Sequence, residues 1–218
     1  MNFKAVIFDL DGTVADTVCD LANCVNYVLN KHNFPMHPTS KFKYFAGDGI
    51  LTMIKRALPE NTPEKTVQLI KNEFFEYYSM HYCDNTRPFD GLVQMIENLK
   101  SYGMKVAVVT NKEQTLAEKV VGKLYGNAFD LVYGMREGIP GKPDPTLTLM
   151  AMNELNVKPE ECAFVGDTSM DIMAGVNSGA YPVGVLWGFR TKEEILSSGA
   201  KAVAENAKEL EKILKGQI

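Results

Sequence analysis

Residues 5–13 read AVIFDLDGT, a short apolar run that ends at two aspartates separated by one residue. The apolar part, residues 5–8, has no polar interruption, which predicts a strand that is buried on both of its faces. Strands of this kind are typical of parallel sheets, because helices cover both faces of such a sheet. The segment therefore predicts a parallel sheet in which one strand ends at an acidic turn.

Three later segments repeat this pattern of an apolar run that ends in polar or glycine-containing sequence. They are KVAVVTN at 105–111, AFVGDT at 163–168 and PVGVLWG at 182–188. Apolar residues recur at helical spacing between these runs, for example at Val93, Ile96 and Leu99. Because strands alternate with helices along the chain, the sequence predicts an α/β fold with a parallel sheet.

Residues 16–84 differ from the rest of the chain, since they contain no convincing strand pattern. Apolar residues recur at helical spacing in 21–29, 50–58 and 67–77, which predicts three helices. These helices form a subdomain inserted after the first strand. The predicted division is therefore a core domain of residues 1–15 and 85–218, and a helical domain of residues 16–84.

Polar side chains follow the predicted strands, at the edge of a parallel sheet where ligands bind. Asp9, Asp11, Thr110 and Asp167 each come directly after an apolar run or within the turn that follows it. Three carboxylates at one edge would repel each other, and a divalent cation would relieve this repulsion. Mg²⁺ favours oxygen ligands and combines a few carboxylates with water and substrate phosphate. The sequence therefore predicts a magnesium site at this edge.

Two further charged residues are expected to lie near this site. Lys142 stands in the segment GKPDP, residues 141–145, where Asp144 is expected to cap a helix. A lysine beside a metal and a phosphate can offset the charge of a transferring group. Asp171 follows Asp167 by four residues, so a helix that starts between them would place Asp171 near Lys142 or the metal.

These residues resemble the four motifs of the haloacid dehalogenase superfamily, in the order that the family has them. The motifs are D-x-D-G-T at 9–13, a strand-ending threonine at Thr110-Asn111, a lysine at Lys142, and G-D-x-x-x-D at 166–171. The resemblance covers essentially the whole chain. It implies a Rossmann-like parallel sheet with helices on both faces, and it identifies the helical insert as the family's cap domain.

The resemblance also implies a role for each matching residue. Asp9 would attack phosphorus and become an aspartyl phosphate, and Asp11 would act as general acid and then as general base. Thr110 and Asn111 would bind the phosphoryl oxygens, and Lys142 would hold the nucleophile and the phosphate. The Mg²⁺ ligands would be Asp9, the main-chain carbonyl of Asp11, and Asp167, with Asp171 in support.

Further features resemble one branch of the superfamily, that of phosphoglycolate phosphatase and β-phosphoglucomutase. They are Gly47-Asp48-Gly49 before a helix, where both glycines would contact substrate, and VLWGF at 185–189. The mutases carry a histidine shortly after the position of Asp16, and residues 17–23, TVCDLAN, contain none. An aspartate at residue 11 is typical of phosphatases and mutases, because a halide leaving group needs no proton. The sequence therefore favours a phosphatase.

The leading hypothesis is an Mg²⁺-dependent phosphatase that acts on a small phosphomonoester, with 2-phosphoglycolate as the first candidate. An inorganic pyrophosphatase, a sugar-phosphate phosphatase and a nucleotidase remain open, because the cap selects the substrate. A phospho-acceptor signalling domain is a distant alternative, since such domains lack a helical insert after the first strand. A non-catalytic relative would be expected to lack Asp9 or Asp11.

The overall composition limits the partners and the compartment. The chain has 218 residues, 45% of them hydrophobic, and a net charge of −4, which is typical of a globular domain that does not attract nucleic acid or an anionic membrane. None of its four cysteines forms a C-x-x-C pair, so free thiols in a reducing cytoplasm are expected. The partner is a small phosphate ester, and both a monomer and a homodimer remain possible.

Overall fold

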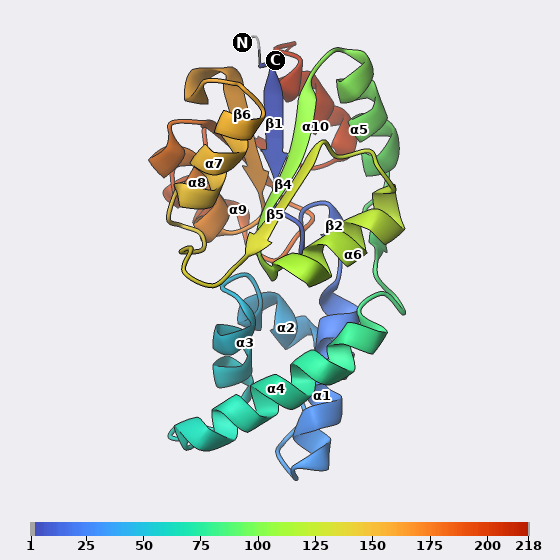
Figure 1. Cartoon of the computed structure of the whole chain (residues 1–218), viewed down its shortest axis with the longest axis vertical. Helices are drawn as coiled ribbons and strands as arrows, with labels where there is room; N and C mark the ends of the chain where they lie inside the picture. The colour runs from blue at the N-terminus through green and yellow to red at the C-terminus, as the bar shows by residue number, and fades with distance from the viewer. Residues whose placement is uncertain (1–2, 218) are drawn as a thin grey trace.

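A six-stranded parallel sheet forms the centre of the larger domain in the computed structural model, which describes residues 3–217 (Figure 1). The strand order is β5-β4-β1-β6-β7-β8. The strands are β5 (Leu131–Met135), β4 (Lys105–Glu113), β1 (Ala5–Phe8), β6 (Cys162–Gly166), β7 (Tyr181–Val185) and β8 (Ala202–Ala204). The predicted α/β fold with a parallel sheet is confirmed.

The first apolar run lies at the middle of this sheet, where it pairs with two strands that are distant in sequence. Phe8 is in register with Val108 of β4 and with Val165 of β6. All four residues of β1 are fully buried, which explains why the run carries no polar residue. Because parallel strands point the same way, this register brings Asp9 beside the ends of the neighbouring runs.

Alternate residues of β1 face different layers of helices. Val6 and Phe8 pack in a cluster with α5 (Leu92–Ser101), α6 (Gln114–Tyr125) and α10 (Ala207–Leu214). Ala5 and Ile7 pack in a second cluster with α7 (Thr146–Glu154) and α8 (Ser169–Ser178). Since side chains alternate across a strand, one four-residue run supplies the core on both faces of the sheet. Helix α9 (Lys192–Ser197) packs against β7, and a 3-10 turn, Pro159–Glu161, precedes β6.

Four helices form a separate cap domain with its own hydrophobic cluster (lower half of Figure 1). They are α1 (Val18–Lys31), α2 (Thr39–Phe45), α3 (Ile50–Ala57) and α4 (Glu64–His81). The sequence pattern predicted three of them and missed α2, which is short and buries only Phe42. Leu116 and Phe189 of the core domain also belong to the cap cluster, so the two domains share apolar contacts.

The two connections between the domains pair with each other as a short antiparallel ribbon. Strands β2 (Ala15–Asp16) and β3 (Arg87–Pro88) form it. Beside this ribbon, the buried Asp20 of α1 accepts hydrogen bonds from the backbone N–H groups of Asn85 and Thr86 and from both of their side chains, at 2.7–3.0 Å. Burial raises the pKa of Asp20, but these hydrogen bonds outweigh it and hold the pKa below its ordinary value of 3.8.

We expect Asp20→Ala to lower the free energy of unfolding by about 3 kcal/mol, because several buried donors lose a charged acceptor at once. The depressed pKa means that Asp20 stabilises the fold at neutral pH, and that this contribution is lost as the pH falls below 3.8 through the folded-state pKa. Urea unfolding at pH 7 measures the change. Asp84→Ala removes an exposed carboxylate of the same connection and is expected to cost less than about 0.5 kcal/mol. Equal losses for the two variants would contradict the role of Asp20.

Three details of the predicted secondary structure were wrong. The sequence pattern missed β5 and β8, since a strand of three to five residues gives little periodic signal. It also ended the second strand at Thr110, whereas β4 continues to Glu113 after a register shift against β5. Thr110 therefore lies inside a strand. Helix α7 starts at Thr146 rather than directly after Asp144, although Asp144 accepts a hydrogen bond from the Thr146 N–H at 2.9 Å.

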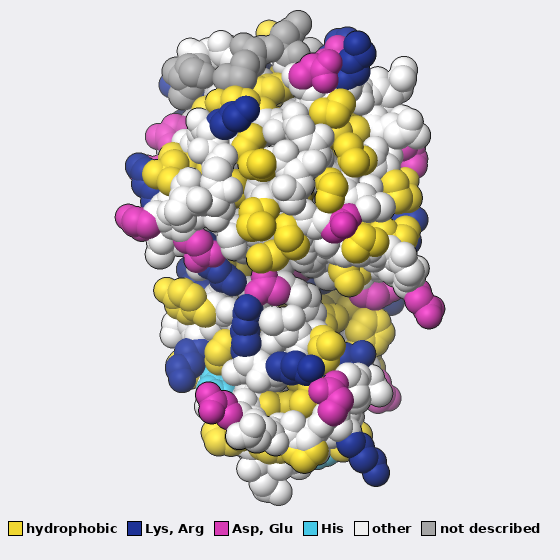
Figure 2. All heavy atoms as spheres, turned by 90° about the vertical axis from the view of Figure 1, so that its left-hand side faces the viewer, with side chains coloured by type: hydrophobic (Ala, Val, Ile, Leu, Met, Phe, Trp, Pro, Cys, Tyr) yellow, Lys and Arg dark blue, Asp and Glu magenta, His cyan; other side chains and the backbone are white. Residues whose placement is uncertain are grey.

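Charged side chains of both signs are interspersed over the face of the molecule that Figure 2 shows. On the described part of this face, basic side chains do not gather into one extended surface. None of the helices within residues 3–217 combines the length and the apolar character that a membrane crossing needs.

Candidate active site

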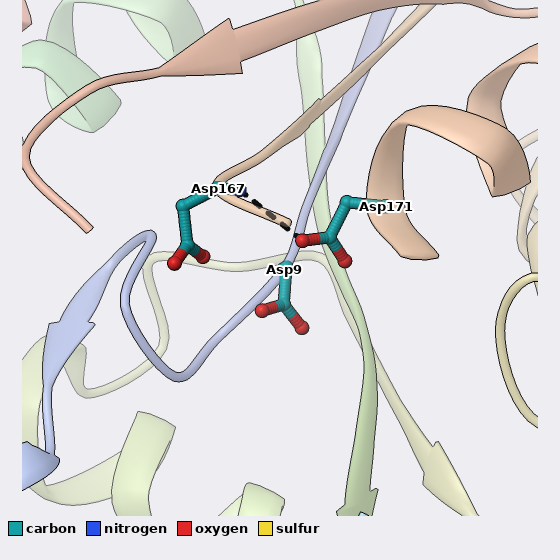
Figure 3. Close-up of side chains that lie close together, drawn as sticks. All are labelled: Asp9, Asp167 and Asp171. Atoms are coloured by element: carbon teal, nitrogen blue, oxygen red, sulfur yellow. Dashed lines mark hydrogen bonds between the residues drawn. The ribbon is translucent and has the colours of Figure 1, made fainter. Parts of the chain in front are cut away.

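Three carboxylates converge at the end of β1, in the loop after β6 and in the first turn of α8 (Figure 3). Asp9, Asp167 and Asp171 each offer an oxygen, and these oxygens lie within 4.8 Å of one another. The three residues are at most 5% exposed. Buried carboxylates at this separation repel each other strongly, so the cluster requires positive charge.

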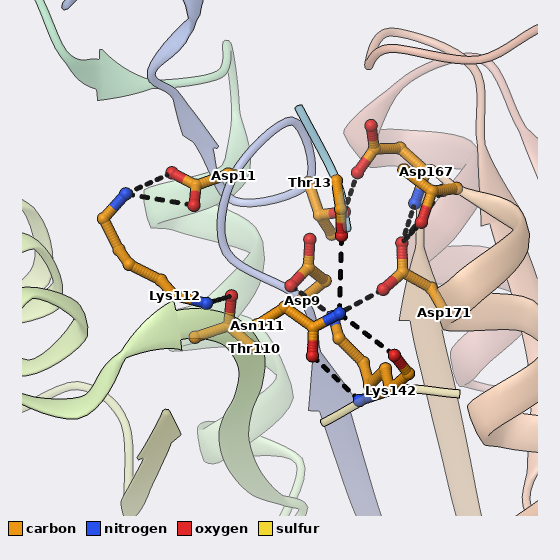
Figure 4. A network of polar contacts seen from close by, with 11 residues as sticks. Asp9, Asp11, Thr13, Thr110, Asn111, Lys112, Lys142, Asp167 and Asp171 are labelled. Atoms are coloured by element: carbon orange, nitrogen blue, oxygen red, sulfur yellow. Dashed lines mark hydrogen bonds and ion pairs between the residues drawn. The ribbon is translucent and has the colours of Figure 1, made fainter. Parts of the chain in front are cut away.

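Lys142 supplies part of that charge from the loop before α7. Its Nζ lies 2.5 Å from an oxygen of Asp9 and 2.5 Å from an oxygen of Asp171 (Figure 4). Burial lowers the pKa of Lys142, but the charges of Asp171 and Asp9 outweigh it and hold the pKa above its ordinary value. The lysine is therefore charged, and it leaves the cluster of three carboxylates with an excess of negative charge.

The pKa values of two of the carboxylates reflect this excess of negative charge. Burial, reinforced by the charge of Asp171, raises the pKa of Asp9 from 3.8 to about 7, despite the opposing effect of Lys142. Burial and the charges of Asp171 and Asp9 also raise the pKa of Asp167 well above its ordinary value. A cluster that holds its protons this strongly, and that presents only hard oxygen donors, fits a divalent cation.

Backbone and hydroxyl donors fix the orientation of Asp167. Its Oδ1 accepts a hydrogen bond from Thr13 Oγ1 at 2.7 Å, and its Oδ2 accepts one from the backbone N–H of Phe189 at 2.8 Å. Gly12 has φ +90° and, like Gly188, lies so close to Asp167 that a Cβ atom would overlap its carboxylate. The glycine of the DLDGT turn therefore leaves space for an aspartate that is 155 residues away in the sequence, and residue 13 binds it.

Asp171 has a different role for each of its carboxylate oxygens. Oδ2 caps α8, since it accepts hydrogen bonds from the Thr168 N–H at 2.9 Å and the Thr168 hydroxyl at 2.7 Å, and Oδ1 accepts the bond from Lys142. The helix starts at Ser169, between Asp167 and Asp171, which is the condition under which the sequence placed Asp171 near Lys142 or the metal. Asp171 is thus both a helix cap and a partner of the acidic cluster.

The side chain of Asp11 points away from this cluster and toward β4 (Figure 4). Both of its oxygens accept hydrogen bonds from Lys112 Nζ, at 2.8 and 3.0 Å. Burial lowers the pKa of Lys112, but the charge of Asp11 outweighs it, and the pKa lies above its ordinary value. The predicted involvement of Asp11 in metal binding concerned its main-chain carbonyl and stays a prediction.

Sequence reasoning missed Lys112, although its side chain is only 3% exposed. A lysine two residues after Thr110 lies on the same face of an extended strand, and this spacing was the available signal. Lysines are almost never fully buried without a partner, and the partner, Asp11, lies 101 residues earlier in the chain. The pattern alone therefore favoured an exposed lysine.

Asn111 mainly contacts the backbone of Lys142. Its side-chain oxygen accepts a hydrogen bond from the Lys142 N–H at 2.8 Å, and its amide nitrogen donates to the Lys142 carbonyl at 3.1 Å. The buried Thr110 hydroxyl accepts a hydrogen bond from the Lys112 N–H at 3.2 Å. The contacts of Asn111 show how β4 positions Lys142. The predicted contacts of Thr110 and Asn111 with substrate stay predictions.

A pocket with a volume of about 40 Å³ lies between the core and cap domains. It is lined by both core and cap residues, which are Asp9, Asp11, Leu21, Ala46, Gly47, Gly49, Ile50, Met53, Tyr78, Thr110, Asn111 and Lys112. Gly47 and Gly49 thus lie on the pocket wall, as their predicted role requires. The pocket brings Asp9 and Asp11 together with a wall that is otherwise largely apolar.

The loop that carries these two glycines is attached to both domains. Arg56 of the cap forms an ion pair with Asp48 at 2.5 Å. Arg190 of the core donates hydrogen bonds to the carbonyls of Lys43 and Ala46. Neither Arg56 nor Lys43 is among the residues that line the pocket.

Comparisons with known proteins agree with this geometry. The family model for haloacid dehalogenase-like hydrolases matches residues 6–185. Phosphoglycolate phosphatase of Aquifex aeolicus is 30% identical over 85% of this chain and 86% of its own length. N-acetylmuramic acid 6-phosphate phosphatase of Pseudomonas aeruginosa is 27% identical, over 98% of this chain and 96% of its own.

A solved structure from Lactobacillus delbrueckii superimposes with a TM-score of 0.94 and 30% sequence identity, over 98% of this chain and 99% of that one. The similarity thus includes the core domain, the inserted cap and the strand ends that carry the acidic cluster. The predicted family is confirmed, and the chain belongs to the haloacid dehalogenase-like hydrolases.

Proposed function

We propose that this protein is an Mg²⁺-dependent phosphatase that hydrolyses a small phosphomonoester through an aspartyl-phosphate intermediate, with 2-phosphoglycolate as the first candidate. One observation carries the proposal. Asp9 and Asp11 open onto the same pocket, but Asp9 is bound to Lys142 and Asp11 to Lys112. Two carboxylates with separate partners suit two roles, a nucleophile and an acid–base catalyst.

The proposed reaction has two displacements at phosphorus. A carboxylate oxygen of Asp9 forms a bond to phosphorus, the bond to the ester oxygen breaks, and Asp11 donates a proton to the departing alcohol. Water then attacks the aspartyl phosphate, and Asp11 takes the proton from that water. Phosphate leaves, and Asp9 is regenerated. Lys142, which bonds to Asp9 at 2.5 Å, holds the nucleophile in place and offsets negative charge.

The acidic cluster supports the choice of Mg²⁺, because its oxygens converge and carry excess negative charge. Asp9 and Asp167 would hold the ion with the main-chain carbonyl of Asp11, and Asp171 would support them. When bound, Mg²⁺ neutralises charge on the carboxylates and on the phosphoryl group. Without such a cation, the approach of a phosphate dianion to three buried carboxylates is unfavourable.

Removal of Mg²⁺ with EDTA is therefore expected to lower phosphate release by at least about 10³-fold, and added Mg²⁺ is expected to restore it. The unfolding temperature should rise with Mg²⁺ concentration, because a ligand of the folded state stabilises it. In Asp167→Asn, this rise should become smaller. The metal proposal fails if EDTA leaves both activity and the unfolding temperature unchanged.

A phosphate-release screen tests the substrate. The relatives' names support two candidates, 2-phosphoglycolate and N-acetylmuramic acid 6-phosphate, and the second represents the sugar-phosphate alternative. Pyrophosphate and nucleoside monophosphates complete the panel. We expect 2-phosphoglycolate to have the highest kcat/KM. If another ester has it, the substrate is wrong and the phosphatase stands, whereas no hydrolysis of any ester contradicts the proposed function.

The proposed partner is this small phosphate ester, without nucleic acid, and the monomer and the homodimer both remain predictions. The four cysteines of the described chain are free, which supports the proposal of a cytoplasmic enzyme. The family match over most of the chain favours a hydrolase over the phospho-acceptor signalling domain.

A further inference from the structure

Tyr78 of cap helix α4 lines the pocket between the two domains. The residue is 1% exposed, and its hydroxyl has no hydrogen-bond partner within residues 3–217. Its ring stacks on Phe74 with the centroids 5.2 Å apart, so the side chain is well packed up to its polar end. Buried hydroxyl groups almost always have a partner. A hydroxyl without a protein partner on a pocket wall is available to a ligand.

Lys112 of core strand β4 lies beside the Tyr78 ring and lines the same pocket. Its Nζ is 4.9 Å from the centroid of the Tyr78 ring and binds both oxygens of Asp11. An ammonium group has three donors, so Lys112 can keep one bond to Asp11 and give the others to a ligand. A cation from the core and a hydroxyl from the cap thus meet in one place.

The other residues of the pocket leave Lys112 as the group that can bind a negatively charged ligand. Among the residues that line the pocket in the described chain, Lys112 is the only cation, and the cap side of the pocket is formed by glycines and by apolar residues such as Ile50 and Met53. The volume of about 40 Å³ corresponds to only a few water molecules. In this position of the cap the pocket has room for a small leaving group, and an anionic end on it has one cation to bind.

We propose that Lys112 and Tyr78 form a subsite for a carboxylate on the leaving group of the substrate. The inference rests on the proposed phosphatase function and specifies its substrate class, small phosphate esters of hydroxy acids. The carboxylate accepts hydrogen bonds from Lys112 Nζ and from the Tyr78 hydroxyl. The carboxylate thus contacts both β4 and α4, so both hydrogen bonds form only when the cap lies against the core. A neutral ester of the same size offers these two donors no charged acceptor.

Two esters of equal length test this subsite. In 2-hydroxyethyl phosphate, a neutral CH₂OH group replaces the carboxylate of 2-phosphoglycolate. We expect wild-type kcat/KM to favour 2-phosphoglycolate by about 100-fold or more, since the neutral hydroxyl of the other ester brings no charge to Lys112 and accepts weaker hydrogen bonds. Equal kcat/KM values for the two esters would overturn the subsite without affecting the phosphatase proposal.

Tyr78→Phe removes one hydroxyl and keeps the stacked ring. We expect it to lower kcat/KM for 2-phosphoglycolate by about 10-fold or more, the effect of one hydrogen bond to a charged group, and to change that for 2-hydroxyethyl phosphate by less than about 2-fold. Tyr77→Phe is the matched control, because Tyr77 belongs to the same helix and does not line the pocket. If Tyr78→Phe behaves like this control, Tyr78 does not bind the carboxylate.

Lys112→Met separates recognition from a purely structural role. A lysine that only positions Asp11 would lower kcat/KM for both esters by the same factor, and the preference would persist. A lysine that binds the carboxylate lowers the preference itself, to within about 3-fold when the charge is lost. A preference that stays at the wild-type value in Lys112→Met overturns the proposal.

A binding experiment decides the subsite independently of turnover. Isothermal titration calorimetry with Asp9→Asn and Mg²⁺ compares the two esters without hydrolysis. Tighter binding of 2-phosphoglycolate, with the difference lost in Asp9→Asn/Tyr78→Phe, supports the subsite even if the wild type hydrolyses neither ester and the proposed function fails. Equal binding of both esters overturns the subsite, whatever the wild type hydrolyses.

Discussion

Replacement of Asp9 by asparagine is expected to lower phosphatase turnover by about 10⁴-fold or more. The asparagine side chain has the shape of aspartate, but its neutral amide cannot form the aspartyl phosphate. Lys142 can still donate to the amide oxygen at the position where it now contacts Asp9 at 2.5 Å. The loss should therefore lie in the chemical step, with a much smaller effect on KM.

The same substitution should leave the fold intact. It removes one of three carboxylates that are at most 5% exposed and lie within 4.8 Å of one another, so the repulsion in the cluster falls. Without metal, the unfolding temperature of Asp9→Asn should be no lower than that of the wild type. Intact-mass spectrometry of protein quenched in acid should detect a covalent phosphate on the wild type and none on the variant.

Asp90→Asn is the matched control, because Asp90 is an exposed aspartate in the segment that returns to the core. It should retain wild-type turnover. If Asp9→Asn keeps turnover within about 10-fold of the wild type, or if it still acquires a covalent phosphate, Asp9 is not the nucleophile. An alternative carboxylate such as Asp171 would then have to be tested in the same way.

Replacement of Lys142 by methionine is the second large effect. We expect the free energy of unfolding without metal to fall by about 3–5 kcal/mol, because Asp9 and Asp171 lose the cation that binds both of them in a buried site. Turnover should fall by about 10³-fold, since nothing then holds Asp9 or offsets the charge of the phosphoryl group. Urea unfolding and phosphate release measure the two losses.

Mg²⁺ should restore part of the stability of Lys142→Met but little of its turnover. The metal adds positive charge to a cluster that has lost its lysine, and its stabilising effect should exceed that in the wild type. Lys119→Met, which removes an exposed lysine of α6, should change stability by less than about 0.5 kcal/mol. A stable and active Lys142→Met protein would contradict the interpretation of the cluster.

Much of the site follows from local sequence, because each motif combines its own secondary structure with its own chemistry. Four buried residues before Asp9 make the strand, and the turn after them contains the glycine that Asp167 requires. In the segment 166–171, Asp171 stands three residues after Thr168, so it completes the cap of a helix and also reaches Lys142. Short-range spacing determines these features, so a single sequence is enough to predict them.

Other features depend on which segments meet, and local pattern does not determine that. Strand β8 has three residues and forms because β7 offers a free edge beside it. Asp20 gives no sign in sequence that it binds Asn85 and Thr86, which are 65 and 66 residues away. Such contacts depend on how the cap packs against the two segments that connect it to the core domain.

Residue types at fixed short spacings are enough to predict the acidic sheet edge, the family and the distinction between a phosphatase and a dehalogenase. The three-dimensional fold, in contrast, pairs Asp11 with Lys112, buries Lys112, and brings to the same pocket the Tyr78 hydroxyl, which has no hydrogen-bond partner within residues 3–217. These residues belong to β1, β4 and α4, and their proximity arises from strand register and domain packing. In the proposed subsite the substrate is selected where those elements meet, so its selection depends on the fold and not on local sequence alone.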